Sequence, residues 1–356
     1  MSRALGGLPL VWSDACLRHD GACGTWVGVG IDADELPERV ELIRAELEAA
    51  GARLVTAPPH DDSTLLAVHD PGLVEFLRTA YGGWVDAGYP VDPGQPRVLG
   101  YIFPTPGLLA GAEPFEPVSG AARTGMWAFD TLTVVGEGTW EAARAAVDCA
   151  LTAADLVARD GGVAYACTRP PGHHVTRSAF GGSCYLNNAA IAAQRLRERG
   201  AERVAIVDID AHHGNGAQAI FWERADVLTG SAHVDPRAGW FPHFLGVESE
   251  RGGGAGEGTN RNLPLAPGTS DEGWLAAIDE LAGWAAIADA LVIALGVDAA
   301  AGDPNSPLLV TEQGYRQAGT RLGRVAKPTV VVQEGGYDLE TIGGLVRAFC
   351  EGLVDP

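Results

Sequence analysis

Short apolar runs rich in β-branched residues alternate with helical segments, and this alternation restricts the possible folds most. The runs are Val163–Ala166, Val204–Val207, Val227–Leu228, Leu291–Leu295 and Thr329–Val332. The helical segments are Glu35–Gly51, Glu141–Arg159 and Asn187–Arg199. Such alternation predicts an α/β fold, with helices covering both faces of a parallel sheet. Ligands bind at the carboxyl ends of strands in these sheets, so the polar motifs that follow the runs are the candidate functional residues.

Length and charge narrow the class of protein. A chain of 356 residues forms one large domain or two, so length alone leaves the domain count open. The net charge of −21 argues against nucleic-acid binding, which requires a basic face, and suits a protein that attracts cations. The longest apolar stretch, residues 274–297, contains three acidic residues. It predicts a buried helix followed by a strand, not a membrane span.

The six cysteines form no C-x-x-C pair, and no signal peptide is recognisable before them. These features predict a reduced, cytoplasmic protein. The cysteines are Cys16, Cys23, Cys149, Cys167, Cys184 and Cys350. Residues 89–120 are dense in proline and glycine and too long for an ordinary connection. A surface excursion and an active-site rim or dimerisation arm both remain open for this segment.

Asp208–Gly216 is the most informative polar motif, because it holds two Asp and two His within six residues directly after an apolar run. Asp210 and His212 are two residues apart, so they point the same way on an extended backbone. A carboxylate and an imidazole that converge in this way favour a divalent-metal site over a simple polar turn.

Three further motifs follow other apolar runs. Arg169–His174 places two histidines beside a rigid Pro-Pro turn, which suits acid–base catalysis, although a solvated loop remains open. Asp298 could supply a further anionic metal ligand or simply end its strand. In Glu334–Tyr337, two glycines allow close backbone approach, and the tyrosine hydroxyl could donate to a developing oxyanion.

The motifs RPPGHH, GGSCYLNNAAIAAQ, DIDAHHGNG, LGVD and EGGY, in this order, resemble the histone deacetylase superfamily. Gly138–Ala143 and Phe241–Gly246 are more similar to the bacterial acetylpolyamine amidohydrolase branch. The resemblance implies a single arginase-like or deacetylase-like α/β domain over residues 1–356, with a central eight-stranded parallel sheet flanked by helices. Residues 89–120 would be an insertion that narrows the site and supports a homodimer.

The resemblance also implies a role for each motif residue. Asp210, His212 and Asp298 would hold the catalytic metal, which is usually zinc, while Fe²⁺ or Co²⁺ is compatible with the same ligands. His173 and His174 would be the tandem catalytic histidines, and Tyr337 would stabilise the oxyanion. Asp208 would orient His173, and Asn215 would support His174. Asp208, Asp210, His212 and Ser231 would help to hold a structural monovalent cation, K⁺.

Two substrate-channel positions depart from the family pattern. The residue after Gly181-Gly182 is usually aromatic and forms one wall of the acyl channel, but here it is Ser183, with Phe241 as the expected opposite wall. The polyamine branch carries an acidic residue for the distant ammonium where this chain has Leu132. Ser183 predicts a wider channel unless Trp240 or Trp127 fills the space. Glu113, Glu116 and Asp130 are candidates to replace the missing acid.

The predicted function is therefore a zinc-dependent amidohydrolase that removes an acetyl or other acyl group from a small acylated amine. An acetylpolyamine or a biosynthetic intermediate would be such a substrate. The alternatives are a protein acetyl-lysine deacetylase and a catalytically inactive protein that binds acetylated metabolites. A two-metal ureohydrolase is disfavoured, because it would need more carboxylate ligands than these motifs supply.

Overall fold

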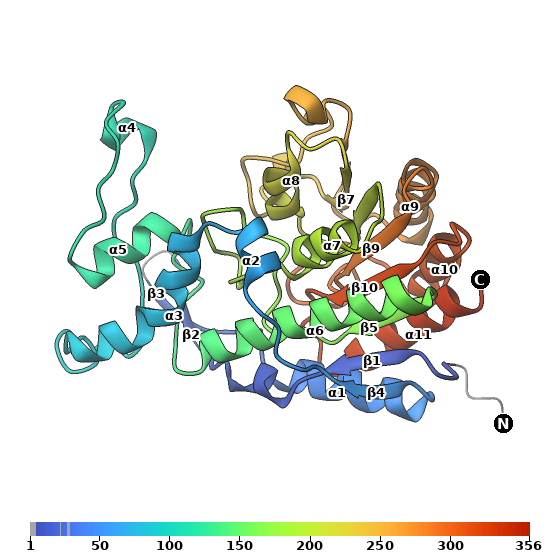
Figure 1. Ribbon diagram of the computed structural model, residues 1–356, viewed down its shortest axis with the longest axis horizontal. Coiled ribbons are helices and arrows are strands. Elements are labelled where there is room, and N and C mark those ends of the chain that lie inside the picture. Colours follow the sequence, from blue (N-terminus) through green and yellow to red (C-terminus); the bar gives the residue numbers. More distant parts are fainter. Residues whose placement is uncertain (1–4, 22, 27–28) are drawn as a thin grey trace.

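A computed structural model describes residues 5–21, 23–26 and 29–356 and shows an α/β domain around an eight-stranded parallel sheet (Figure 1). The strands of this sheet are β1 (Pro9–Trp12), β4 (Arg53–Thr56), β5 (Val163–Ala166), β6 (Val204–Asp208), β7 (Val227–Val234), β8 (Asn260–Leu265), β9 (Ala290–Leu295) and β10 (Thr329–Gln333). Their spatial order is β4-β1-β5-β10-β9-β6-β7-β8, and every pair is parallel. The predicted fold class is confirmed.

Helices cover both faces of the sheet. They are α1 (Glu38–Ala49), α2 (Ser63–Val68), α3 (Pro71–Asp86), α4 (Pro106–Leu109), α5 (Gly120–Trp127), α6 (Thr139–Asp160), α7 (Asn188–Glu198), α8 (Asn215–Phe221), α9 (Asp271–Ala285), α10 (Glu312–Gly323) and α11 (Ile342–Val354). One core contains α6 and α7 with β9 residues Val292 and Ala294, and the other contains α1, α9, α10 and α11 with Leu291 and Ile293. Alternate residues of each central strand enter opposite cores, which is why these strands are continuously apolar.

The sequence predicted the five central strands and missed β1, β4 and β8. Two of the missed strands, β4 and β8, are the edges of the sheet. Edge strands carry polar residues and tolerate proline, because one side of their backbone lacks a strand partner. In β8, Arg261 and Pro264 break the apolar pattern for this reason.

Two segments lie outside the layers of the sheet and its helices. The 89–120 segment projects away from the body with α4 at its far end (Figure 1). A hairpin of β2 (Cys23–Trp26) and β3 (Val29–Asp32) is held by its backbone, since Thr25 donates to the carbonyl of Thr131 (3.2 Å). No helix within the described residues is long and apolar enough to span a membrane.

Candidate active site

The polar motifs meet at one edge of the sheet because their strands are adjacent and parallel. The order β5-β10-β9-β6 places the carboxyl ends of these four strands side by side. The segments that follow them carry His173 and His174, Tyr337, Asp298, and Asp210 with His212. Residues separated by more than 160 positions in the chain therefore share one site.

Asp210, His212 and Asp298 bring three potential metal ligands together, with one ligand atom of each within 4.8 Å of the others. His212 Nδ1 lies 3.2 Å from Asp210 Oδ1 and 2.9 Å from Asp298 Oδ2. Burial and the charge of Asp210 raise the pKa of Asp298 to about 7. A Cβ at Gly335 would lie 2.5 Å from Asp210 Oδ2, so a glycine is required for this close approach. Two buried carboxylates beside one imidazole form a donor set that suits a divalent cation.

The tandem histidines lie beside this group, and each ring is fixed by one polar partner. His173 Nδ1 is 3.0 Å from Asp208 Oδ2, and His174 Nδ1 is 2.7 Å from Asn215 Oδ1. Burial lowers the pKa of His173, but the carboxylates of Asp210 and Asp208 outweigh burial and raise that pKa well above its usual value. Burial and the neighbouring His173 hold the pKa of His174 well below its usual value. The two adjacent imidazoles thus have opposite tendencies to hold a proton.

The turn that carries Tyr337 is held from two sides by residues that the sequence patterns did not reveal. Arg39 donates to the carbonyls of Glu334 (2.6 Å) and Gly336, and its guanidinium lies 4.8 Å from the centre of the Tyr337 ring. Asp303 Oδ2 accepts the backbone N–H of Tyr337 at 2.7 Å. Burial raises the pKa of Tyr337 well above its usual value, so the phenol keeps its proton.

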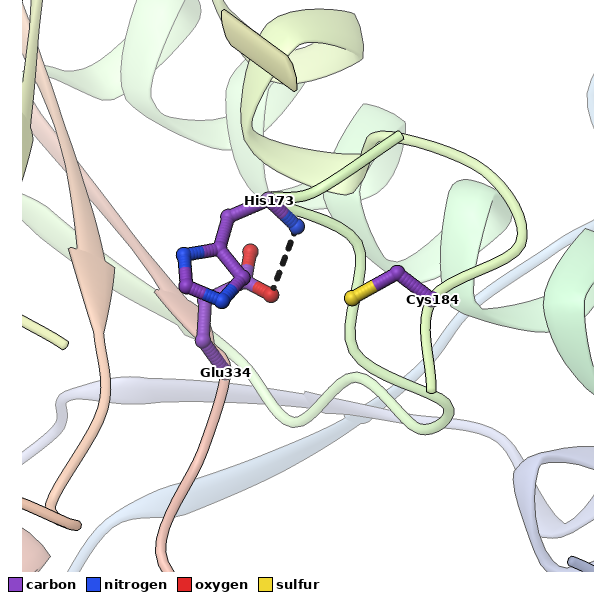
Figure 2. A group of neighbouring side chains, drawn as sticks. All are labelled: His173, Cys184 and Glu334. Atoms are coloured by element: carbon purple, nitrogen blue, oxygen red, sulfur yellow. Dashed lines mark hydrogen bonds between the residues drawn. The ribbon is translucent and has the colours of Figure 1, made fainter. Parts of the chain in front are cut away.

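Glu334 and Cys184 form a second buried group with His173 (Figure 2). Glu334 Oε2 accepts the backbone N–H groups of Gly172 (2.6 Å) and His173 (3.1 Å). Burial raises the pKa of Glu334 to about 8, and its Oε1 has no hydrogen-bond partner within the described part of the chain. These backbone contacts hold the Pro-Pro-Gly-His turn. Sequence reasoning assigned no role to Glu334, although it begins the motif that ends in Tyr337.

A cavity of about 390 Å³ opens above the histidines and is lined by His174, His212 and Tyr337. The four predicted channel residues Gly182, Ser183, Phe241 and Leu132 line the same cavity. The Phe241 ring packs edge-on to His174, with 4.8 Å between ring centres.

Of the two tryptophans that could fill the space beside Ser183, one lines the cavity and the other does not. Trp240 lines the cavity, whereas Trp127 packs against Gly72 in α3. Trp26, from the β2–β3 hairpin, also lines the cavity, and sequence reasoning missed it because the hairpin lies far from every motif. Ser183 itself has a left-handed backbone (φ 61°), and its N–H donates to Thr133 Oγ1 at 2.8 Å.

The acids proposed to replace a charge at Leu132 are not free in the cavity. Asp130 Oδ2 accepts the N–H of Gly182 at 2.6 Å, and its Oδ1 accepts the N–H of Thr133 at 2.9 Å. Glu116 forms an ion pair with Arg123. Glu113 is exposed in the 89–120 segment and does not line the cavity.

Two of the residues predicted to hold a monovalent cation lie on neighbouring strands of the sheet. Asp208 in β6 pairs in register with Ser231 in β7. Asp208 Oδ1 accepts the N–H of Asp210 at 3.1 Å, while Ser231 Oγ lies 2.8 Å from His233 Nδ1. Asp210 and His212 belong to the segment that directly follows β6.

Known proteins share this fold and these motifs. The histone deacetylase domain model matches residues 33–353. An acetylpolyamine amidohydrolase of Mycoplana ramosa is 42% identical over 322 residues, which are 90% of this chain and 92% of that protein. Acetylpolyamine amidohydrolase 1 of Pseudomonas aeruginosa is 40% identical and covers 94% of this chain and 95% of its own length. The crystal structure of acetylpolyamine aminohydrolase from Burkholderia pseudomallei has a TM-score of 0.90 at 36% identity, covering 98% of both chains.

The chain therefore belongs to the histone deacetylase family. It is a hydrolase of the deacetylase type, in a family whose members depend on a metal. The predicted similarity to bacterial acetylpolyamine amidohydrolases is also confirmed.

Proposed function

We propose that this protein hydrolyses the amide bond of a small acylated amine, with acetyl as the acyl group and an acetylpolyamine as the reference substrate. The observation that carries the proposal is the convergence of Asp210, His212 and Asp298 with His174 and Tyr337 beside one cavity. The names of the relatives support the same reaction for those proteins.

Asp210, His212 and Asp298 would hold a divalent ion, for which the oxygen and nitrogen donors suit Zn²⁺ and also Fe²⁺ or Co²⁺. Such an ion, when bound, supplies Lewis-acid polarisation of the amide carbonyl and activation of water. Asp208, Asp210, His212 and Ser231 would hold K⁺ in a structural role next to it.

The side chains around the ion perform the remaining chemistry. His174, oriented by Asn215, takes a proton from the attacking water. Tyr337 donates its hydroxyl hydrogen to the oxyanion that forms on the acyl carbon. His173, which is held by Asp208, provides the second imidazole, and one of the two histidines protonates the leaving amine.

Metal analysis and a substrate panel test this proposal together. We expect the wild-type protein to bind one divalent ion per chain and Asp210→Ala and His212→Ala proteins to lose it. Full metal occupancy in both variants would refute the assignment. The panel contains acetylputrescine, acetylspermidine, acetyl-lysine peptides and longer acyl-lysines, with the free amine measured.

The panel also separates the alternatives. Release of amine from the peptides alone would favour a protein deacetylase. Tight binding without hydrolysis would favour an inactive binding protein. Homodimerisation through the 89–120 segment belongs to the same proposal and is tested separately below.

A further inference from the structure

A second hollow lies beside the catalytic cavity and is larger and mostly apolar. We call it the apolar groove. It has a volume of about 610 Å³, and its lining includes Phe103, Phe129, Leu132, Phe241, Phe244 and Leu245. Phe103 comes from the 89–120 segment, and Phe244 is 92% exposed. An apolar hollow of this size next to a catalytic site is large enough for the side group of a small ligand.

The groove and the catalytic cavity have walls in common. Four residues line both hollows, namely Trp26, Leu132, Phe241 and His243. The Phe241 ring lies between them, because it meets His174 edge-on at 4.8 Å and stacks on Phe129 at 6.2 Å between ring centres. The two hollows are therefore adjacent across Leu132 and Phe241, and a substrate whose amide lies beside His174 would reach the groove by passing over these two side chains.

The groove offers no free charge to an ammonium group. Asp130 is the one acidic residue among its described lining residues, and both of its oxygens accept hydrogen bonds from Gly182 and Thr133. Leu132 presents a hydrocarbon side chain to both hollows. A cation that entered this groove would exchange part of its hydration for aromatic faces and a carboxylate that is already hydrogen-bonded, whereas an uncharged group has no such hydration to lose.

We propose that the apolar groove binds the distal part of the amine and selects an uncharged alkyl or aryl group there. This inference rests on the proposed function, which places the amide at the catalytic cavity. The preferred substrates are then acylated amines with an apolar end, and a polyamine with a terminal ammonium is a poorer substrate.

Carboxylates on the other side of the catalytic cavity would attract an ammonium group and so favour a polyamine substrate instead. Glu35 is buried and pairs with Arg39 and Arg169, while Asp34 accepts a hydrogen bond from Asn305 at 3.1 Å. Asp32, at the end of β3, is exposed to solvent. An exposed carboxylate attracts an ammonium weakly, because water and salt screen the charge. An aromatic group that leaves water gains more, since such a ring buries roughly 150–250 Å².

A pair of substrates with the same four-carbon linker tests the proposal. Acetylputrescine ends in an ammonium, and N-(4-phenylbutyl)acetamide ends in a phenyl ring. We expect kcat/KM of the wild-type enzyme to favour the phenyl compound by about tenfold or more, which is the discrimination that one apolar contact typically provides. Ala179→Leu narrows the groove, because Ala179 lines the groove and not the catalytic cavity. It should depress activity on the phenyl compound and spare acetylputrescine.

Leu132→Glu should shift the preference toward acetylputrescine, because it places a carboxylate between the two hollows. Ala286→Leu, an exposed change at the end of α9, is the matched control and should leave both activities unchanged. A wild-type preference for acetylputrescine would overturn the proposal, and loss of that preference in Asp32→Asn would assign the selectivity to the acidic side. Equal loss on both substrates in Ala179→Leu, or a change in its oligomeric state, would also overturn it. If the wild-type enzyme hydrolyses neither compound, the proposed function fails instead.

Discussion

The position of the Tyr337 hydroxyl depends on a turn, and two charged residues of opposite sign hold the backbone of that turn. Arg39 donates to carbonyls on both sides of Gly335, and Asp303 accepts the N–H groups of Tyr337 and Asp338. Both are buried side chains that act on backbone atoms. The placement of the phenol is thus set by residues that need not touch a substrate.

Tyr337→Phe should lower turnover by about 10²–10³, because one donor to a developing oxyanion is typically worth that much. Metal content should stay at the wild-type level, since Tyr337 is not among the metal ligands. Steady-state kinetics and metal analysis on the same preparation check both points. A variant with wild-type turnover would show that Tyr337 has no role at the oxyanion.

Asp303→Ala should reduce kcat by roughly tenfold to 10²-fold through misplacement of Tyr337, with KM less affected. The test is a double-mutant cycle with Tyr337→Phe. If Asp303 acts through the hydroxyl, its effect on kcat disappears once the hydroxyl is absent. Asp303→Asn, which keeps one acceptor oxygen, should recover part of the rate. Losses that simply add in the double variant would mean that Asp303 has only a general structural role.

Residues of the candidate site that lie within the motifs were predictable from sequence, including Asp208 and Asn215 beside the two histidines, whereas residues that hold the backbone of the motifs were not. Asp210 and His212 could be paired because two-residue spacing on an extended segment fixes their direction. Asp303 and Glu334 act on backbone N–H groups that are 34 and 162 positions away in the chain. Backbone groups are the same in every residue, so no local pattern announces such contacts.

At the scale of elements, the turn from Phe180 to Cys184 places Gly182 and Ser183 in the wall of the cavity. Gly182 and Ser183 both have left-handed backbones, and a Cβ at Gly182 would lie 2.3 Å from the His174 ring. Ser183 therefore lies in a tight turn against His174 and lines the cavity.

Ser183→Phe should raise selectivity for slender acyl groups over bulky ones by roughly 1–3 kcal/mol, because a ring would narrow the channel. The measurement is kcat/KM for a short and a bulky acylated amine in both proteins. Ser183→Ala is the control, because it keeps the backbone strain of a left-handed residue without adding a ring. An unchanged ratio with uniformly lower rates would mean that the ring only overpacks the site.

How closely the predicted strands matched the observed strands depended on the position of each strand in the sheet. Val163–Ala166 was predicted at its observed limits, and Leu291–Leu295 was one residue short. Strand β1 was missed because it begins with a proline, which weakens a strand prediction. The hairpin that contributes Trp26 was missed too, because its strands carry glycines and lack an apolar alternation.

At the scale of the whole molecule, the exposed apolar side chains of the 89–120 segment are the feature that a monomer explains least. Its side chains Val91, Tyr101, Leu108, Phe115 and Val118 are all more than half exposed. Scattered apolar residues are common on surfaces, but five of them on one projecting segment favour an interface.

We expect a homodimer in sedimentation-velocity experiments and a monomer after Phe115→Ser with Val118→Ser. The substitutions should leave the fold of the monomer intact, with a wild-type circular-dichroism spectrum, because neither side chain enters a core. Leu42→Ser with Leu66→Ser, two other exposed apolar positions, provides the matched control. A wild-type protein that sediments as a monomer at micromolar concentration would contradict the dimer.

The position of β10 has a consequence for how the protein is made. It is the last strand along the chain, yet it lies between β5 and β9 near the middle of the sheet. While the chain leaves the ribosome, β4-β1-β5 and β9-β6-β7-β8 can form only as two separate partial sheets, each with an open inner edge. Open edges are prone to pair with other chains, and parallel pairing over long separations is slow. The segment that closes this gap also delivers Tyr337, so a nascent chain becomes an enzyme only at the step that makes it a complete sheet.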